Sequence, residues 1–307
     1  MPTSRRPHWG ISPLMRQVLQ ALCAVAATTS LLTHAGETTN KIGVTMVDIP
    51  AGSFMMGSCK SSMIEENKKR SAWGQPILPD DCPSSDPNAE DNETPQHRVS
   101  VSAFQMSKTE VTLGQFKQYI AAIGRSDLVD DDFMKYNSNG DNAPVVQVSW
   151  NDAQSFIDWL NKTDGGGYRL PSESEWEYAC RAGGSSTYCG SDSVGSVAWY
   201  DGIGGNRVHD GNSGNRAHSV GTKQGNAFGL YDMSGNVWEW VQDYYHDNYR
   251  GAPADGSAWT SGGEQKYRVL RGGSWGNHAS YARAANRVSL SPDNRLDDFG
   301  LRLARTR

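Results

Sequence analysis

The sequence predicts an α+β fold: a single loop-rich domain with low regular secondary structure. Three observations support this prediction. The 307 residues include 33 glycines and 10 tryptophans, which is typical of irregular backbone held by large aromatic side chains. The hydrophobic content of 37% is enough for a sizeable core. No break in composition and no repeat period divides the chain, so one domain is expected over residues 36–307.

Residues 1–35 have the pattern of an export signal peptide. Three arginines precede an apolar run, residues 18–32, that is shorter than a comfortable membrane span. Thr33 and Ala35 place small residues at the two positions that a signal peptidase inspects, so cleavage is expected after Ala35. An interfacial or single-pass anchor is the alternative interpretation of the same run.

Charge then limits the classes of partner. Removal of residues 1–35 changes the formal charge from −5 to −8, because three arginines and no acidic residue leave with them. An exported protein with this charge has no general attraction for nucleic acid or anionic lipid. We therefore expect a periplasmic, cell-surface or secreted protein with no integral membrane segment after cleavage. Its partner is expected to be an unidentified protein or small-molecule ligand.

Four cysteines remain after cleavage, an even number in a compartment that permits oxidation. Proximity in the sequence favours the pairs Cys59–Cys82 and Cys180–Cys189. Four cysteines allow three connectivities, and a set of free structural thiols is the alternative.

The first part of the domain alternates strand-like and polar segments. Residues 44–58 alternate apolar and polar side chains around a Pro-Ala-Gly turn, which predicts two strands in a hairpin. Residues 59–95 are polar, charged and rich in Asp, Ser and Pro, which predicts a long loop insertion. Residues 97–111 resume the alternation of a strand.

Three helices follow, each with a recognisable start. Thr112 can cap the first helix, and Gly124 ends it. Ser149 and Ser172 begin the other two, because each is followed three residues later by an acidic residue, as in a capping box. Gly183 is the expected end of the third helix. Beyond it glycine and asparagine become frequent, and no further helix is predicted.

Six motifs occur in series: PAGSFMMGS, TEVTLGQF, RLPSESEWEYACRAG, NAFGLYDMSGNVWEW, RVLRGGSW and FGLRLAR. Together and in this order they resemble the formylglycine-generating enzyme family, also called the sulfatase-modifying factor family. The resemblance covers nearly all of residues 36–307. It implies one domain with little regular secondary structure, related to the C-type lectin fold.

The resemblance also implies what is missing. The founding enzyme oxidises a substrate cysteine with a copper ion held by two cysteines just after the GGS strand, and copper(I) prefers such soft thiolates. Aligned on residues 272–275, the first of these positions is Asn277 and the second falls near Ala282. No cysteine follows Cys189. Copper is therefore not expected, nor is formylglycine generation by the known mechanism.

The resemblance leaves two roles without copper open for this chain. Variable proteins of diversity-generating retroelements carry a hypervariable C-terminal segment whose NNY codons cannot encode Lys, Glu, Gln, Met or Trp. None of these five residue types occurs from Gly276 to Arg307. This similarity implies a ligand- or protein-binding module, diversified by a retroelement.

The second role is that of exported maturation oxidases, such as the periplasmic protein that finishes the pyoverdine chromophore. These relatives also lack the copper cysteines. The alternative function is therefore an exported oxidoreductase or maturation factor, with His278 and Tyr281 handling substrate protons.

For both functions, residues 271–307 would form the groove that binds the ligand or the substrate. The expected contact residues lie in three stretches of this segment: Gly276, Asn277, His278, Tyr281, Val288, Ser289, Leu290, Ser291, Leu296, Asp297, Asp298 and Phe299. The expected fixed residues have large side chains: Arg271, Trp275, Arg283, Arg287, Arg295 and Arg302. A planar guanidinium suits this role because it bonds several loop carbonyls or a carboxylate at once.

The stretch NAFGLYDMSGNVWEW resembles one structural calcium site of the family. Carried over by position, Asp232 and Glu239 supply side-chain oxygens, while Gly235 and Val237 supply backbone carbonyls. A hard cation prefers this mixture of oxygen ligands. A turn held by the neighbouring tryptophans without an ion is the alternative. The scattered histidines do not predict a zinc or iron centre.

Overall fold

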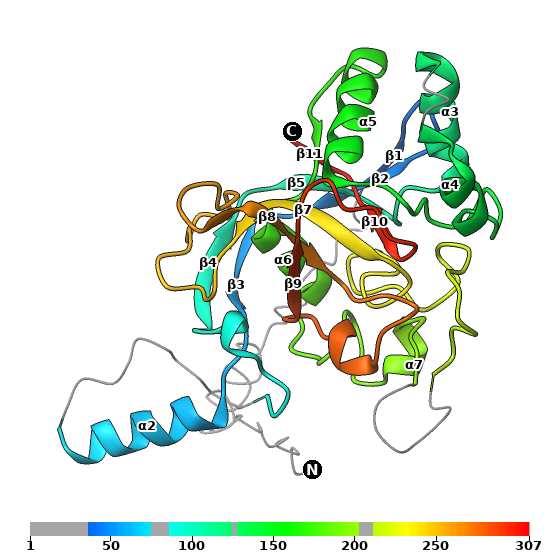
Figure 1. Ribbon diagram of the computed structural model, residues 1–307. Coiled ribbons are helices and arrows are strands. Elements are labelled where there is room, and N and C mark those ends of the chain that lie inside the picture. The colour runs from blue at the N-terminus through cyan, green and yellow to red at the C-terminus, as the bar shows by residue number, and fades with distance from the viewer. Residues whose placement is uncertain (1–35, 75–85, 125–127, 203–210, 307) are drawn as a thin grey trace, which may run out of the picture. The chain divides into compact units, whose positions relative to one another are not determined.

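The computed structural model describes residues 36–74, 86–124, 128–202 and 211–306 (Figure 1). These residues belong to one compact unit, Ala35–Arg307. The expected export signal, residues 1–35, lies outside the described ranges. Among the described residues, no helix has the length and apolar character needed to cross a lipid bilayer.

The largest sheet joins strands from both ends of the domain in the order β1-β2-β5-β11-β6. Its members are β1 (Glu37–Thr39), β2 (Thr45–Ile49), β5 (Phe104–Ser107), β6 (Tyr168–Arg169) and β11 (Ala304–Thr306). The late strand β11 lies between β5 and β6 and is antiparallel to both. The sheet therefore stays open until the final residues of the domain are in place.

A second sheet, with the order β10-β7-β8-β9, contains β9 and β10 of the C-terminal segment and ends its strand β8 at Arg271. Its strands are β7 (Trp238–Tyr245), β8 (Glu264–Arg271), β9 (Arg287–Leu290) and β10 (Phe299–Leu301). The parallel pairing of β10 with β7 sets Phe299 opposite Trp238. The antiparallel pairing of β8 with β9 sets Arg271 opposite Arg287. Residues 272–286 therefore leave and return at one end of this sheet.

The hairpin predicted for residues 44–58 is wrong, although both of its strands exist. β3 (Gly52–Met56) pairs with β4 (His97–Val101), whereas β2 pairs with β1 and β5. The turn between β2 and β3 thus carries the chain from one sheet to another. An alternating pattern identifies a strand, but it does not identify the strand that pairs with it.

The three predicted helices are confirmed as α3 (Leu113–Ile123), α5 (Trp150–Thr163) and α6 (Glu173–Arg181). Each begins with a capping box in which the side chain and backbone of the capping residue are both bonded. Gly124 ends α3 in the left-handed conformation at φ 65°. After α6 this conformation starts one residue before the predicted stop, at Ala182 (φ 46°).

Two regions predicted as loop contain helices. α2 (Ser61–Ala72) occupies much of the expected insertion, residues 59–95, and contains the ion pairs Glu65–Lys68 and Glu66–Arg70. Its side chains are mostly polar, so it lacks the apolar periodicity that identifies a helix in a sequence. The other short helices are η1 (Asp91–Glu93), α4 (Asp131–Tyr136), α7 (Val194–Val197) and η3 (Ala279–Ala282).

The core consists of two large hydrophobic clusters. In the first, α3 and α5 pack together (Figure 1), with Phe116 stacked on Phe156 at 5.3 Å between ring centroids. Trp240 of β7 belongs to the same cluster. The second cluster surrounds α6 and includes the fully buried Trp176. Large aromatic side chains anchor both clusters, as the composition suggested.

One buried acid on β7 makes the stability of the domain depend on pH. Asp243 is fully buried and accepts hydrogen bonds from the backbone N–H groups of Glu173 and Trp259. Burial, followed by the nearby charge of Glu173, raises the pKa of Asp243 from 3.8 to about 7. The folded protein therefore retains this proton at pH values where the unfolded chain has lost it.

This shift predicts a loss of stability as pH rises through the window from 3.8 to about 7. The slope from this single group would reach at most ~1.4 kcal/mol per pH unit. Asp243→Asn should flatten the dependence of the unfolding free energy on pH, whereas Asp158→Asn on the exposed side of α5 should not. Urea unfolding between pH 4.5 and 7.5 measures both. An unchanged slope in Asp243→Asn would contradict the assignment.

Candidate functional site

Four fully buried arginines hold the C-terminal segment in place, and together we call them the arginine frame: Arg271, Arg283, Arg287 and Arg302. Each pairs with an acid from elsewhere in the chain. The shortest ion-pair distances are 2.5 Å from Arg271 to Glu177, 2.6 Å from Arg283 to Glu93, 2.7 Å from Arg287 to Glu173 and 2.8 Å from Arg302 to Glu239. The segment is therefore anchored through partners outside it.

The frame also binds loop carbonyls. Arg271 donates to the carbonyl oxygens of Ala284, Ala285 and Asn286 at 2.9, 2.8 and 2.5 Å, so the returning chain folds around its guanidinium group. Arg302 donates to the carbonyl of Ser107 on β5 at 2.8 Å. These contacts satisfy backbone oxygens that lack a partner in a sheet.

Arg295 and Trp275 behave differently from the four buried arginines. The Arg295 side chain is 37% exposed and makes two hydrogen bonds with Asp152, at 2.6 and 2.8 Å. Trp275 is half-buried and packs against a small cluster that includes Val146 and Val237. Both residues lie at the boundary between the frame and the surface.

The expected contact residues lie mainly on the outside of the frame. The exposed ones are Gly276, His278, Tyr281 and Leu296, and the half-buried ones are Asn277, Val288, Ser289, Leu290, Ser291, Asp297 and Asp298. We call these eleven residues the contact set. Val288 and Leu290 pack partly against the core, so less of their surface is available to a partner.

Phe299 is a correction to the expected contact residues. It is 3% exposed, and its ring meets Trp240 edge-on at 5.5 Å between centroids. The parallel pairing of β10 with β7 buries it. It was expected at the surface only through the resemblance to a variable C-terminal segment, and the strand pairing that buries it joins residues far apart in the chain.

Ser274 brings two stretches of the contact set together. Its hydroxyl oxygen lies 2.6 Å from Asn277 Oδ1 and 2.7 Å from Asp298 Oδ2. Because a hydroxyl has one hydrogen to donate, a protonated Asp298 can supply the second bond, and burial raises the pKa of this carboxyl. Residues 276–278 and 296–298 therefore share one surface. The third stretch, residues 288–291, lies on and directly after β9, an edge strand of its sheet.

The positions of the family's copper cysteines hold groups that are engaged elsewhere. The Asn277 carbonyl accepts a hydrogen bond from Asp201 N at 2.8 Å, and the Ala282 carbonyl accepts one from Ser234 Oγ at 2.8 Å. Neither side chain provides a thiolate. His278, the nearest histidine, caps η3 by accepting a hydrogen bond from Ser280 N. Its capping contact gives it a structural role.

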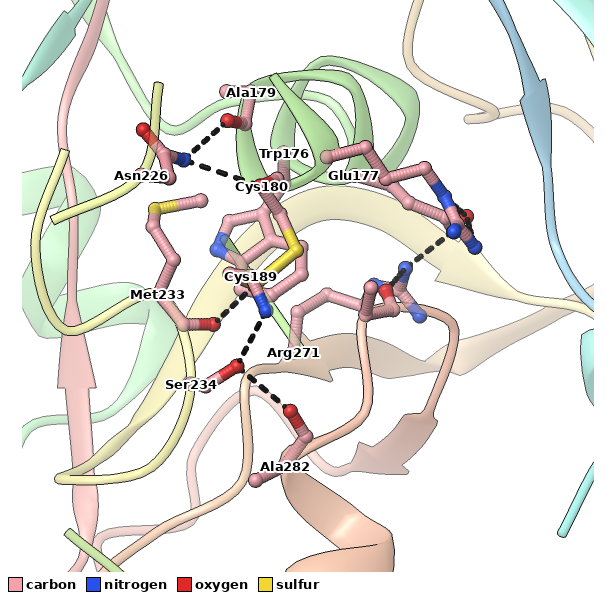
Figure 2. Close-up of a disulfide and its surroundings, with 12 residues drawn as sticks. Trp176, Glu177, Ala179, Cys180, Cys189, Asn226, Met233, Ser234, Arg271 and Ala282 are labelled. Carbon is pink, nitrogen blue, oxygen red and sulfur yellow. Dashed lines mark hydrogen bonds and ion pairs between the residues drawn. A yellow bond between two sulfur atoms is a disulfide. The ribbon is translucent and has the colours of Figure 1, made fainter. Parts of the chain in front are cut away.

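A disulfide lies next to this region (Figure 2), and the predicted pair Cys180–Cys189 is confirmed with an S–S distance of 2.07 Å. Cys189 N donates to Ser234 Oγ at 3.0 Å, and Ser234 Oγ donates onward to the carbonyl of Ala282. Cys59 is disulfide-bonded, and its expected partner Cys82 lies outside the described residues.

The four expected calcium ligands precede or begin β7, and their two carboxylates differ. Asp232 is 2% exposed, with Oδ2 accepting from Gly221 N at 2.6 Å and Oδ1 having no partner within the described part of the chain. Glu239 accepts from Trp176 Nε1 at 2.6 Å, and both of its oxygens accept from Arg302. Burial raises the pKa of Asp232 to about 6. One carboxylate is thus open to a cation and the other is shared with an arginine.

Sequence reasoning missed a third carboxylate beside them. Glu110 is 1% exposed, and its two oxygens accept from Asn236 Nδ2 at 2.8 Å and Val237 N at 3.2 Å. Burial, followed by the charges of Asp232 and Glu239, raises the pKa of Glu110 well above its ordinary value. It lies 126 residues before Asn236, so no local pattern relates the two. Over the described ranges, no group of three or more His, Cys, Asp or Glu residues is arranged to hold a metal ion.

The fold and these motifs agree with comparisons to known proteins. A family model described as "Sulfatase-modifying factor enzyme 1-like domain" matches residues 33–307. The chain belongs to the sulfatase-modifying factor family. A curated relative, the formylglycine-generating enzyme of Streptomyces coelicolor, is 30% identical over 271 residues. The alignment covers 70% of this chain and 82% of that enzyme.

Two solved structures are also similar to the chain. PvdO from Pseudomonas aeruginosa has 33% identity and a TM-score of 0.70, with 89% of this chain and 98% of that chain covered. Treponema denticola variable protein 1 has 26% identity and a TM-score of 0.64, with coverage of 88% and 98%. The chain is therefore a single sulfatase-modifying factor domain with an α+β, C-type-lectin-like fold.

Proposed function

We propose that the chain is an exported binding module of the sulfatase-modifying factor family that does not use copper. Its contact set would bind a protein or a small-molecule ligand in the periplasm or outside the cell. The observation that supports this proposal is the division of the C-terminal segment into a buried arginine frame and an outward-facing contact set. Tyrosine, histidine and leucine at exposed positions suit an adaptable contact surface.

The same division suits diversification by a retroelement. None of the frame ion pairs includes a member of the contact set, so exchanges in the set leave the anchoring contacts intact. The similarity to a Treponema denticola variable protein supports this extension. The absence of Lys, Glu, Gln, Met and Trp after Trp275 also supports diversification by a retroelement.

Sequencing the gene in many isolates of one strain tests the diversification. We expect substitutions at contact-set codons such as those of Asn277, His278 and Tyr281, and none at the codons of the arginine frame. A reverse-transcriptase gene and a near-copy of the segment should lie nearby. An invariant segment with neither element beside it would contradict diversification and leave the binding role to be tested with ligands.

The similarity to PvdO favours a second candidate, an exported oxidoreductase or maturation factor that uses the same surface. His278 is the discriminating residue because it caps η3 and is also exposed. His278→Asn replaces the capping ring nitrogen with an amide oxygen and removes the imidazole, whereas His278→Ala removes both the imidazole and the capping acceptor. If the protein turns over a substrate and both variants lose this activity at unchanged melting temperatures, the result would favour the enzyme.

Copper chemistry is testable on the purified mature protein. We expect no stoichiometric copper after incubation with copper(I), and no aldehyde on a cysteine-containing peptide, because Asn277 aligns with the first ligand position, the second falls near Ala282, and no cysteine follows Cys189. Metal analysis and peptide mass spectrometry measure the two results. Stoichiometric copper together with a peptide aldehyde would refute this part of the proposal.

We also propose that the domain takes a structural calcium ion beside Asp232. Three buried carboxylates there share the single guanidinium of Arg302, so a divalent cation would balance their charge. The unpartnered Asp232 Oδ1 and the carbonyls of Gly235 and Val237 would bind it, with Glu239 shared between the ion and Arg302. Such an ion would hold the turn that leads into β7.

Thermal unfolding tests the calcium proposal. We expect calcium at 100 times its dissociation constant to add about 2.7 kcal/mol to the unfolding free energy, and EGTA to reverse the gain. Asp232→Asn should remove most of the response, whereas Asp255→Asn on an exposed turn should keep it. An equal melting temperature with calcium, magnesium and EGTA would exclude the ion.

A further inference from the structure

We propose that the edge of strand β9 pairs with an extended segment of a partner protein, which adds a strand to the second sheet at Ser289. This inference rests on the proposed binding function and deepens it, because it names the class of partner for one stretch of the contact set. Three observations carry it: the direction of the main-chain groups on β9, their lack of partners, and the burial of the neighbouring side chains.

The hydrogen bonds of β7 fix the direction in which β8 and β9 turn their main-chain groups. Trp238 N on β7 donates at 2.8 Å to the carbonyl that precedes β10, on the side away from β8. Successive residues of a strand turn these groups to opposite sides, so Glu239 faces β8 and bonds Arg271 opposite it. The preceding residue of β8, Leu270, therefore faces β9 and bonds Val288.

The same alternation turns the N–H and C=O groups of Ser289 outward, away from β8. Val288 and Leu290, on either side of it, are the residues of β9 that bond to β8. Arg287, two residues before Ser289, should also face outward. Its carbonyl accepts a hydrogen bond from Asn92 Nδ2 at 3.4 Å, a side chain outside this sheet, which agrees with that direction.

The outward groups of Ser289 are open to a partner. Over the described residues, no hydrogen bond reaches its outward N–H or C=O. The edge ends two residues later, where the Ser291 carbonyl accepts from Asn294 N at 3.0 Å in a turn. A donor and an acceptor side by side on a sheet edge match the backbone of another strand, which offers both groups in return.

The side chains next to Ser289 favour an extended protein segment over a small molecule. Val288 and Leu290 are half-buried and pack partly against the first hydrophobic cluster, so each offers an apolar rim rather than a whole side chain. An added strand would place its own apolar side chains beside these two, because cross-strand neighbours share a face. Main-chain groups also persist when side chains are exchanged, which suits a surface whose side chains vary.

Hydrogen exchange and a peptide library test the added strand on the exported protein. In the free protein, the Ser289 amide should exchange much faster than the amides of Val288 and Leu290, which are bonded to β8. Linear peptides are then selected on the wild-type protein from a random library displayed on phage, and calorimetry measures their affinities. A bound peptide should slow exchange at Ser289.

Ser289→Pro is the decisive variant. It removes the outward N–H but keeps β9 paired with β8, because proline is tolerated on an edge strand where the missing N–H would face solvent. Peptide affinity should fall about tenfold, since a peptide carbonyl loses its donor. Ser289→Ala keeps the N–H and is the matched control, with affinity unchanged. Should the proline variant not fold, peptides N-methylated at the residue that donates to the Ser289 carbonyl apply the same test to the unaltered protein.

The possible failures are distinct. A library that yields no binding peptide, or peptides that bind Ser289→Pro as tightly as the wild type, would overturn the added strand and leave the proposed function to the other contact residues. A free protein that is a dimer with a protected Ser289 amide would make a second copy the occupant and overturn the inference. Binding that depends on Ser289 but not on Tyr281 or Leu296 would support the added strand and contradict the wider contact set.

Discussion

Replacing Glu173 with alanine is expected to lower the unfolding free energy by about 3–5 kcal/mol, the cost of leaving one partner of a buried ion pair alone. Arg287 is 1% exposed, and its Nε and Nη2 atoms each donate to Glu173 at 2.7 Å. Burial opposes the charge of this guanidinium, but the Glu173 carboxylate more than offsets that effect and raises the pKa of Arg287. The arginine stays charged when its partner is removed, because a guanidinium group is not deprotonated in proteins.

The position of Glu173 increases this effect. The same carboxylate accepts from the buried Tyr249 hydroxyl at 3.0 Å, so the alanine variant removes the acceptor of that hydroxyl as well as the acceptor of Arg287 Nε and Nη2. Urea unfolding measures the loss. Lys117→Ala, which breaks an exposed pair with Asp141, is the control and should cost about 0–1 kcal/mol. A similar small loss in Glu173→Ala would show that the arginine frame does not stabilise the segment.

Removing the Cys180–Cys189 disulfide is expected to cost about 2–4 kcal/mol. The two cysteines are 0% and 3% exposed, and they join the end of α6 to the loop that supports η3 (Figure 2). The double variant Cys180→Ser, Cys189→Ser would place two hydroxyls in this buried space, whereas Cys180→Ala, Cys189→Ala would not. The alanine variant therefore measures the loss of the bond itself.

The disulfide should also affect the contact set. Ser234 connects Cys189 to the carbonyl of Ala282, the residue that follows Tyr281. In the alanine variant we expect faster amide exchange at Tyr281 and unchanged exchange in α3, measured by hydrogen exchange. Loss of stability without faster exchange at Tyr281 would mean that the frame alone holds η3.

The sequence predicted those parts of the fold that short-range chemistry determines. Thr112, Ser149 and Ser172 cap their helices as expected, because each capping contact joins residues three positions apart. The partners of β2 and β3 were not predictable, since strand pairing depends on contacts far apart in the chain. The helix α2 lacks an apolar stripe and so gave no signal.

In the candidate site, too, residue types were predictable from the sequence, whereas long-range contacts were not. The arginines of the C-terminal segment were recognisable by residue type, but their carboxylate partners lie on α6, η1 and β7 and were not. Glu110 was missed because its contacts with Asn236 and Val237 are entirely tertiary. Phe299 was misplaced because the parallel pairing that buries it has no local pattern.

The interior position of β11 in the largest sheet, between β5 and β6, has a consequence for biosynthesis. β11 carries Ala304–Thr306 and separates β5 from β6, so these two strands cannot be joined in one sheet before the ribosome has released residues 304–306. A nascent chain that lacks β11 leaves the facing edges of β5 and β6 unpaired. A premature stop codon shortly before β11 would yield a product open to proteases.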